Sequence, residues 1–402
     1  MNTLLFLSIT VALGSPTVES WPAFRGNGHS VSDAQDLPLR WSSDEGVAWQ
    51  APLPGYGQSS PVVWKNRVFV TCVEGAQKET LHLACIELRS GKALWTKQLP
   101  ASQKEANDGY HSKAAPTPAV DARRVYAFWE TGDLVAFDHA GALDWQRSLT
   151  HEYGPFRGNH GLGSSIALSE KAVIVLVAHG GDCYLLAVDR NSGKNTWKVA
   201  QPSGAGWSSP VVTRLGNREV VLVSISGRVE AYSASDGARL WSFTGIEGNN
   251  VPSPAVAGEH IVVGSRVPGS NLALSSDGKK KSPPKVAWKA MGVTSSFGSP
   301  LAYRDSAYFV NRPGVVTCVE LTTGKKHWQH RLSKSCWASP LGAGDRVYFF
   351  AQNGKTTVLR AGDKLEVLAE NTLTVEGRVY GVAAVDRRLV IRTGSKLICV
   401  GK

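Results

Sequence analysis

Long apolar runs are almost absent from this sequence of 402 residues. The one exception lies within residues 1–20, where a short apolar run is followed by small and polar residues. Such a run is too short to cross a bilayer and is typical of a cleaved signal peptide. No cysteine directly follows it, which argues against a lipid anchor. We therefore expect a signal peptide at 1–20, one domain at 21–402, no transmembrane segment, and export to the periplasm or the extracellular space.

Adjacent cysteines are also missing. The six cysteines are dispersed, and Cys85, Cys318 and Cys399 take a position that alanine fills in other copies of the repeat described below. Equivalent positions in different repeat units lie too far apart for the Cα separation of roughly 4.4–6.8 Å that a disulfide requires. We expect these three to be small buried side chains. The state of Cys72, Cys183 and Cys336 stays open.

Clustered charge is scarce, although the net charge is +11. The only tight basic run, Lys279 to Lys281, lies in a stretch rich in Ser, Gly and Pro that is typical of a loop. No segment interleaves basic and aromatic residues as a nucleic-acid groove does. A sustained helical apolar period is missing too, which excludes a helical fold. We expect no nucleic-acid partner.

What the sequence does contain is a repeat built on tryptophan. Five tryptophans follow a glycine by four positions, and Trp49 and Trp288 continue the series without that glycine. The five pairs are Gly91–Trp95, Gly141–Trp145, Gly193–Trp197, Gly237–Trp241 and Gly324–Trp328. Self-similarity at a period of roughly 20–50 residues indicates an array of supersecondary units.

Each copy opens with small residues and usually a proline, as in Ser59-Ser60-Pro61, and eight openings can be counted. Three strands, a glycine turn and a fourth strand that carries the tryptophan follow. Four short antiparallel strands in a period of roughly 45 residues describe a propeller blade. The seventh copy is irregular, because the position four after Gly362 is Glu366 rather than tryptophan.

The two ends of the chain complement each other. The last copy has three strands, whereas the strand around Trp49 precedes the first opening and has no blade of its own. Pairing the two removes two exposed sheet edges. We predict an all-β fold, an eight-bladed β-propeller of four-stranded antiparallel blades, closed by this N-terminal strand on the C-terminal blade.

The segments at 187–197 and 318–328, which surround the glycine and tryptophan of two copies, resemble the repeat of the PQQ-like β-propeller superfamily. The blades of that superfamily carry the motif Ala-x-Asp-x-x-Thr-Gly-x-x-x-Trp. The resemblance covers essentially the whole chain after residue 20. It implies either a quinoprotein dehydrogenase that uses pyrroloquinoline quinone (PQQ) and calcium, or a non-enzymatic scaffold of the BamB type. The opening Trp21 to Gly26 also resembles the start of exported bacterial members whose role is undefined.

The residues favour the scaffold. Many dehydrogenases of the superfamily carry an adjacent Cys-Cys pair, which this chain lacks, and its carboxylates near the openings, Asp108, Glu152 and Glu247, are scattered. A glycoside hydrolase would need two facing carboxylates, which sequence alone cannot pair. We expect no catalytic residue, metal or cofactor, and a monomeric binding or assembly scaffold of the bacterial cell envelope with a protein or peptide partner. The alternative is a PQQ-dependent dehydrogenase with calcium.

The candidate binding residues come from the segments that precede each opening. Propeller geometry places these segments around one mouth of the central channel, and they vary between copies while the framework repeats. Aromatic, Arg, His and Asn side chains there are suited to binding. The predicted mouth residues are Tyr56, Tyr110, His111, Asn159, His160, Trp207, Trp337, Arg378 and Tyr380. The alternative is that these loops only plug the channel.

Overall fold

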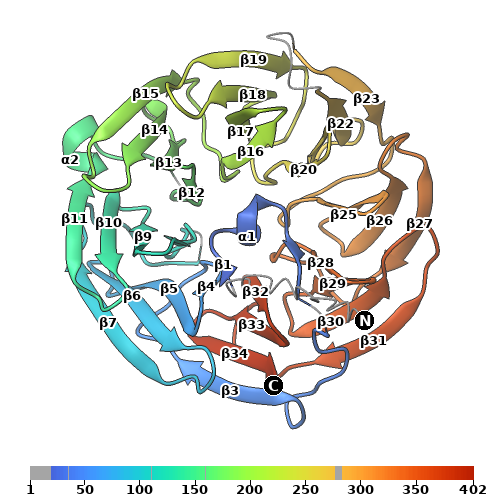
Figure 1. Cartoon of the computed structure of the whole chain (residues 1–402), viewed down its shortest axis with the longest axis horizontal. Coiled ribbons are helices and arrows are strands. Elements are labelled where there is room, and N and C mark those ends of the chain that lie inside the picture. The colour runs from blue at the N-terminus through green and yellow to red at the C-terminus, as the bar shows by residue number, and fades with distance from the viewer. Residues whose placement is uncertain (1–19, 35, 110, 159, 277–282) are drawn as a thin grey trace, which may run out of the picture.

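The computed structural model describes residues 20–34, 36–109, 111–158, 160–276 and 283–402. Residues 1–19 of the expected signal peptide and the run Lys279 to Lys281 therefore lie outside the described residues. Eight antiparallel sheets form a closed ring around a central channel (Figure 1), which confirms the predicted eight-bladed propeller.

Each blade runs from an inner strand at the channel to an outer strand at the rim of the ring. Blade 1 contains β4 (Val62–Trp64), β5 (Arg67–Glu74), β6 (Thr80–Glu87) and β7 (Ala93–Pro100), and blade 2 contains β8 (Ala119–Val120), β9 (Arg124–Phe128), β10 (Asp133–Asp138) and β11 (Leu143–Ser148). Blade 3 contains β12 (Ala167–Leu168), β13 (Ala172–Val177), β14 (Cys183–Asp189) and β15 (Asn195–Gln201), and blade 4 contains β16 (Val211–Leu215), β17 (Arg218–Ile225), β18 (Arg228–Ser233) and β19 (Arg239–Thr244). A short helix, α2 (Leu149–Tyr153), joins blades 2 and 3.

The other four blades follow the same order around the ring. Blade 5 contains β20 (Ala255–Ala257), β21 (His260–Val263), β22 (Leu272–Ser275) and β23 (Lys285–Lys289), and blade 6 contains β24 (Leu301–Tyr303), β25 (Ser306–Val310), β26 (Val315–Glu320) and β27 (Lys326–Arg331). Blade 7 contains β28 (Leu341–Ala343), β29 (Arg346–Phe350), β30 (Lys355–Arg360) and β31 (Val367–Thr372). Blade 8 contains β32 (Gly381–Val385), β33 (Arg388–Arg392) and β34 (Lys396–Gly401), with β3 (Val47–Pro52) as its outer strand. The pairing of β3 with β34, which sets Trp49 opposite Cys399, confirms the predicted closure.

The repeated glycine and tryptophan lock neighbouring blades together. Trp197 of blade 3 donates its indole N–H to the Ala234 carbonyl of blade 4 at 3.0 Å. The three atoms nearest to a Cβ built on Gly237 all belong to the Trp197 ring, the closest at 2.7 Å. The glycine of one blade therefore meets the tryptophan of the preceding blade. The same indole bond runs from Trp49 to Leu88, Trp95 to His139, Trp145 to Arg190, Trp288 to Leu321 and Trp328 to Gly362.

The small opening residues link the blades at the channel. The Ser165 amide of blade 3 donates to Ser209 Oγ of blade 4 at 2.9 Å, and the Ser209 amide donates to Ser253 Oγ of blade 5 at 2.8 Å. Equivalent bonds join Ser60 to Thr117, Thr117 to Ser165, Ser253 to Ser299 and Ser299 to Ser339. A short hydroxyl side chain at the openings of blades 2 to 7 thus accepts from an amide of the preceding blade, which satisfies that amide where it is buried.

Blade 7 departs from the repeat at its outer strand. Register places Ala369 opposite Val358, where blade 6 places Trp328 opposite Cys318, so Ala369 rather than Glu366 takes the tryptophan position. Glu366 instead forms an ion pair with Arg360 in a longer turn. The N-terminal segment covers this blade, since Asn371 accepts from the Trp41 amide at 2.8 Å.

The segment before β3 enters the channel, a position that the repeat pattern does not predict. β1 (Ser20–Trp21) pairs with β4, β2 (Val31–Ser32) pairs with β28, and α1 (Arg25–Gly28) lies between them at the centre of the ring (Figure 1). The buried Arg25 guanidinium donates to the Pro254 and Pro300 carbonyls. Burial lowers the pKa of Arg25 to about 9.

All six cysteines are buried and unpaired. This confirms the prediction for Cys85, Cys318 and Cys399. No helix of the described residues has the length and hydropathy needed to cross a bilayer.

Candidate functional site

The predicted mouth residues lie in the loops that lead into the inner strands. Tyr56 precedes β4, His111 precedes β8, His160 precedes β12 and Trp207 precedes β16. Trp337 precedes β28, while Arg378 and Tyr380 precede β32. Tyr110 and Asn159 lie outside the described residues.

Four aromatic rings form a continuous series along the mouth, which we call the aromatic arc: Phe297, Trp337, Tyr380 and Tyr56. The Phe297 and Trp337 rings are stacked, with centroids 4.7 Å apart. Trp337 meets Tyr380 edge-on at 5.9 Å, and Tyr380 meets Tyr56 edge-on at 6.2 Å. Because blade 8 adjoins blade 1, the arc extends from blade 6 to blade 1 across the closure of the ring. All four side chains are partly exposed.

Two cations lie over this arc. The Arg378 guanidinium is 4.8 Å from the centroid of the Trp337 ring, and Lys113 Nζ is 5.1 Å from that of Tyr56. The hydroxyl groups of Tyr56 and Tyr380 share a hydrogen bond of 2.7 Å. Burial and this bond raise the pKa of Tyr56, so its hydroxyl stays protonated at neutral pH. The arc therefore offers apolar faces, hydroxyl groups and positive charge.

A buried arginine lies beside the arc. Arg392 is fully buried; its Nε donates to the Thr393 carbonyl at 2.7 Å and its Nη2 to the Thr71 carbonyl at 3.3 Å. Within the described ranges, Nη1 has no partner and no carboxylate forms an ion pair with Arg392. A buried cation without a counter-ion is costly, which makes this position unusual.

The remaining predicted residues form separate contacts. His160 and Trp207 face each other with ring centroids 5.9 Å apart, and the Trp207 amide donates to the Asn250 carbonyl. His111 Nδ1 lies 2.9 Å from Asp108 Oδ1. Tyr56, Trp337, Arg378 and Tyr380 are thus brought into one group, whereas His111 contacts Asp108 and His160 contacts Trp207.

Sequence reasoning missed Phe297, Lys113 and Arg392. Phe297 and Lys113 lie in the same mouth loops as the predicted residues. The sequence therefore places them at the mouth, but it does not show which side chains they contact. Arg392 ends the apolar strand β33, and a basic residue that continues a buried strand is the signal that could have identified it.

A buried ion pair supports the loop that carries Lys113. Lys78 Nζ lies 3.4 Å from Glu130 Oε1 and 3.3 Å from Glu105 Oε2. Glu130 Oε1 also accepts from the Ala114 amide at 2.9 Å. Burial raises the pKa of Glu130 to about 7, and Lys78 opposes that shift.

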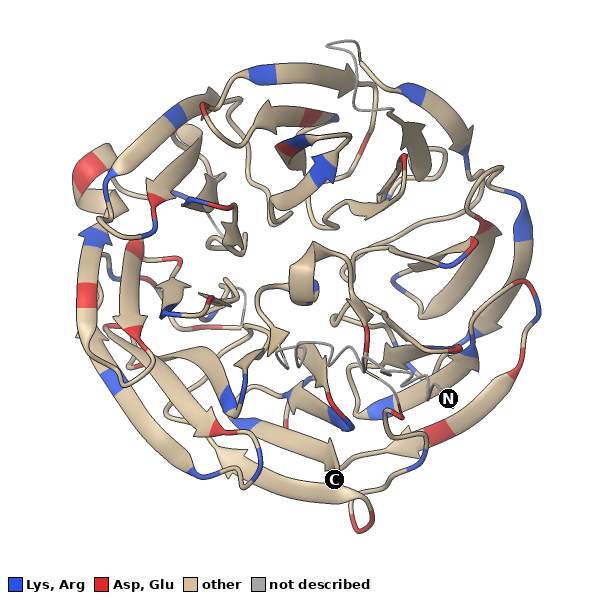
Figure 2. Ribbon diagram, in the orientation of Figure 1, with Lys and Arg blue, Asp and Glu red and all other residues tan. Residues whose placement is uncertain are grey.

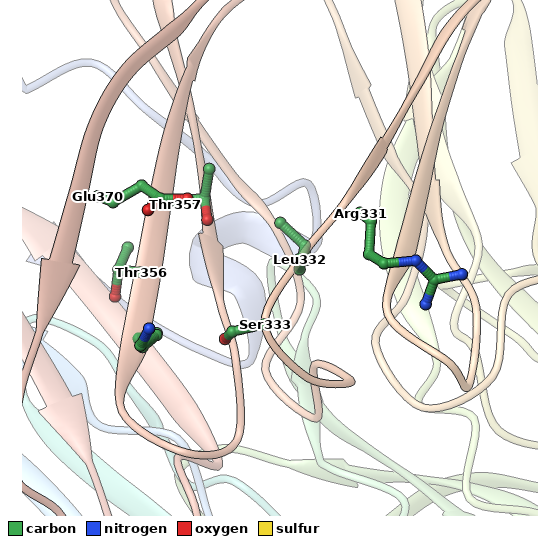
Figure 3. Close-up of a pocket in the computed structure, with 7 residues that line it drawn as sticks. Arg331, Leu332, Ser333, Thr356, Thr357 and Glu370 are labelled. Carbon is green, nitrogen blue, oxygen red and sulfur yellow. The ribbon is translucent and has the colours of Figure 1, made fainter.

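Several depressions formed by the described residues lie outside the aromatic arc, including the following two. One, of about 330 Å³, lies between blades 6 and 7 and is lined by Arg331, Leu332, Ser333, Lys355, Thr356, Thr357 and Glu370 (Figure 3). The other, of about 460 Å³, lies between the segment around α1 and blades 3 and 4. None of the predicted mouth residues that the structure describes lines either depression.

The fit to the PQQ and calcium of the dehydrogenase alternative can be tested on the residues. Calcium takes roughly six to eight oxygen ligands, usually with several carboxylates. The described residues contain no group of three His, Cys, Asp or Glu side chains arranged for a metal. The expectations of no metal, no cofactor and no catalytic residue stay predictions.

The sequence matches a family model described as outer membrane protein assembly factor BamB over residues 13–159, 132–283 and 282–366. The chain belongs to this family. BamB of Shewanella oneidensis is 27% identical over 251 residues, which cover 58% of this chain and 60% of that relative. BamB of Yersinia pestis is 25% identical over 294 residues, which cover 69% and 63%. The chain thus spans about three fifths of the length of these curated relatives.

Solved structures share the architecture of the family. BamB from Moraxella catarrhalis superposes with a TM-score of 0.65 at 16% identity, over 89% of this chain and 97% of that chain. A europium-containing methanol dehydrogenase superposes with a TM-score of 0.68 at 12% identity, over 94% and 90%. At these identities the likeness shows the propeller fold alone.

Proposed function

We propose that this protein is a non-enzymatic binding scaffold of the bacterial cell envelope that holds a partner protein at the channel mouth. The aromatic arc, with its two overlying cations, is the observation that carries the proposal. Tryptophan, tyrosine and arginine dominate the energetics of protein interfaces. Here they are partly exposed on loops held by rigid blades, so little ordering is needed on binding.

Family membership supports the location and class of the partner. The relatives are named as assembly factors of outer membrane proteins, which agrees with an exported protein in the periplasm or at the cell surface. The partner is accordingly an envelope protein or a peptide segment of one, bound by a monomeric propeller.

Capture of partners from an envelope extract tests the proposal. The immobilised wild-type protein is compared with Trp337→Ala and Arg378→Ala. Arg304→Ala is the matched control, because Arg304 lies 5.8 Å from the Tyr303 ring centroid in a turn of the opposite face. We expect capture to fall by roughly fivefold or more in the mouth variants, since truncating a central interface side chain costs about 1–2 kcal/mol or more. Equal capture by all four proteins would contradict a role for the mouth.

The dehydrogenase alternative has its own test. Purified protein is titrated with PQQ in the presence and absence of calcium, and quinone absorbance and dye reduction are followed. We expect no stoichiometric uptake. Calcium-dependent uptake at one quinone per chain, with dye reduction, would replace the scaffold proposal by an oxidoreductase.

A further inference from the structure

We infer that the junction of blades 8 and 1 is a receptor site for a carboxylate side chain, an aspartate or glutamate of the bound polypeptide. This inference rests on the proposed function, because it specifies the chemistry that the mouth recognises in its partner. Four side chains make the site: Tyr56, Tyr380, Arg378 and Lys113, with Arg392 beneath them.

The two tyrosines leave one hydroxyl hydrogen for a ligand. Each hydroxyl can donate one hydrogen bond, and the single bond of 2.7 Å between Tyr56 and Tyr380 uses one of the two hydrogens. In the described part of the chain, neither hydroxyl has a further hydrogen-bond partner. The pair can therefore donate outward to an acceptor, and a carboxylate oxygen is the strongest acceptor that a protein offers.

Positive charge at the junction is not neutralised. Neither Arg378 nor Lys113 forms an ion pair with an acidic side chain of the described residues. Glu376, two positions before Arg378, is instead 3.4 Å from Lys396. Arg378 is exposed and Lys113 is partly exposed, so both can reach a ligand on the rim.

Arg392 adds a fixed charge from below. Tyr56 packs so closely on Gly394 that a Cβ there would lie 2.0 Å from the tyrosine ring, and Arg392 Nη2 donates to the Gly394 carbonyl at 3.2 Å. The guanidinium thus lies under the tyrosine pair with carbonyl and thiol acceptors only, and its Nη1 has no partner among the described residues. A carboxylate at the junction would supply the missing opposite charge.

The wider rim favours the same ligand. Charges of both signs occur around the ring (Figure 2), but the described loops on the mouth face of blades 5 to 8 carry more basic than acidic residues. They contain Arg266, Arg312, Lys334 and Arg378 against Glu247 and Glu376. An approaching acidic segment is attracted to this side.

The neighbouring rings indicate what flanks the acid. Side chains two positions apart on an extended peptide point to the same face, about 6.6–6.8 Å apart. The Tyr380 and Trp337 ring centroids are 5.9 Å apart, and Phe297 is stacked beyond Trp337. An extended segment that places an acid over the tyrosine pair therefore places its second-next residue beside the stacked rings of Trp337 and Phe297. The fitting sequence is an acid, any residue, and an aromatic or aliphatic residue.

Matched peptides test the site. The probes are fluorescein-labelled, amide-capped peptides of sequence Gly-Ser-Glu-Ser-Phe-Ser-Gly and the same peptide with Gln in place of Glu. Binding is measured by fluorescence anisotropy, with free glutarate as a competitor. We expect the Glu peptide to bind roughly tenfold more tightly, as hydrogen bonds to a charged group contribute about 1.5–3 kcal/mol.

Three variants locate the discrimination. In Arg378→Gln and Tyr380→Phe, we expect the preference for Glu to fall at least severalfold, whereas Arg304→Gln on the opposite face keeps it. Equal affinity for both peptides, no binding of the Glu peptide at millimolar concentration, or a preference that survives in both mouth variants overturns the inference. Displacement by glutarate at concentrations comparable to the peptide assigns the site to a small free acid and overturns the polypeptide ligand. If the wild-type protein does not distinguish the Glu peptide from the Gln peptide but still captures its envelope partner, the carboxylate site is wrong and the scaffold proposal stands. The two failures are therefore distinguishable.

Discussion

The contact between Trp197 and Gly237 predicts a specific pattern of energetic coupling between blades. Gly237 has φ +72°, and a methyl group there would meet the Trp197 ring at 2.7 Å. Gly237→Ala should therefore destabilise the protein by about 1–2 kcal/mol for the left-handed backbone, plus the cost of displacing the indole. Trp197→Ala alone should cost roughly 3–5 kcal/mol, because a buried ring and its bond to the Ala234 carbonyl are lost.

In the double variant the collision no longer exists. The two changes should then cost less together than the sum of the single changes, by about 0.5–3 kcal/mol, which is the range for residues in contact. The control cycle pairs Gly237→Ala with Trp241→Ala, the tryptophan that follows this glycine by four positions in its own blade. Because the three atoms nearest to a Cβ at Gly237 are all in Trp197, the control cycle should be additive within about 0.5 kcal/mol.

Urea unfolding followed by far-UV circular dichroism gives the four free energies of unfolding in each cycle. Tryptophan fluorescence is unsuitable, since two of the variants in each cycle lack a tryptophan. Additivity in the Trp197 cycle, or coupling only in the Trp241 cycle, would refute the assignment of the glycine to the tryptophan of the preceding blade.

Three further predictions concern buried groups. Ser209→Ala should cost about 1–3 kcal/mol in urea unfolding, because it leaves the buried Ser165 amide without its acceptor, whereas the exposed Ser333→Ala should be nearly neutral. Since burial raises the pKa of Glu130 from 4.5 to about 7, the unfolded chain loses this proton first; the free energy of unfolding should decline as the pH rises through that window, and Glu130→Gln should flatten the decline. A decline of equal slope in the Gln variant would assign it to other groups. Because all six thiols are buried, none should react with iodoacetamide in the native protein at neutral pH, and all six should react in urea. Burial also raises the pKa of Cys336 to about 12, which keeps that thiol in its unreactive protonated form. Mass spectrometry of the native sample showing a modified cysteine would contradict their burial.

The blades were predictable because the repeat encodes contacts between neighbours. Each glycine and tryptophan serves an interface that recurs around the ring, so the pattern determines the number of blades and the strand that completes the last one. The segment around α1, which enters the channel, is not repeated elsewhere in the sequence. Arg25 contacts the Pro254 and Pro300 carbonyls, which are far away in sequence, and no local signal specifies a partner of that kind. In blade 7, a longer turn moved the tryptophan position from Glu366 to Ala369, which counting from Gly362 could not anticipate.

The sequence predicted which loops form the mouth but not which of their side chains contact one another. Tyr56, Trp337, Arg378 and Tyr380 could be selected because they vary between copies, but which of them meet depends on how the loops are packed. The junction also depends on ring closure, which brings Tyr380 of the last blade against Tyr56 of the first. Arg392 lies in a strand rather than in a loop, so the variation between the loops does not point to it.

Photo-crosslinking in intact cells tests the central claim, that the mouth holds an envelope protein, most directly. Benzoylphenylalanine is placed at Trp337 on the mouth and, as the control, at Tyr303 on the opposite face, where both side chains are partly exposed aromatics. The proposal predicts a discrete crosslinked envelope protein from position 337 that is weakened by Arg378→Ala, and none from position 303. A crosslink from 303 alone, or no crosslink from 337, would contradict it.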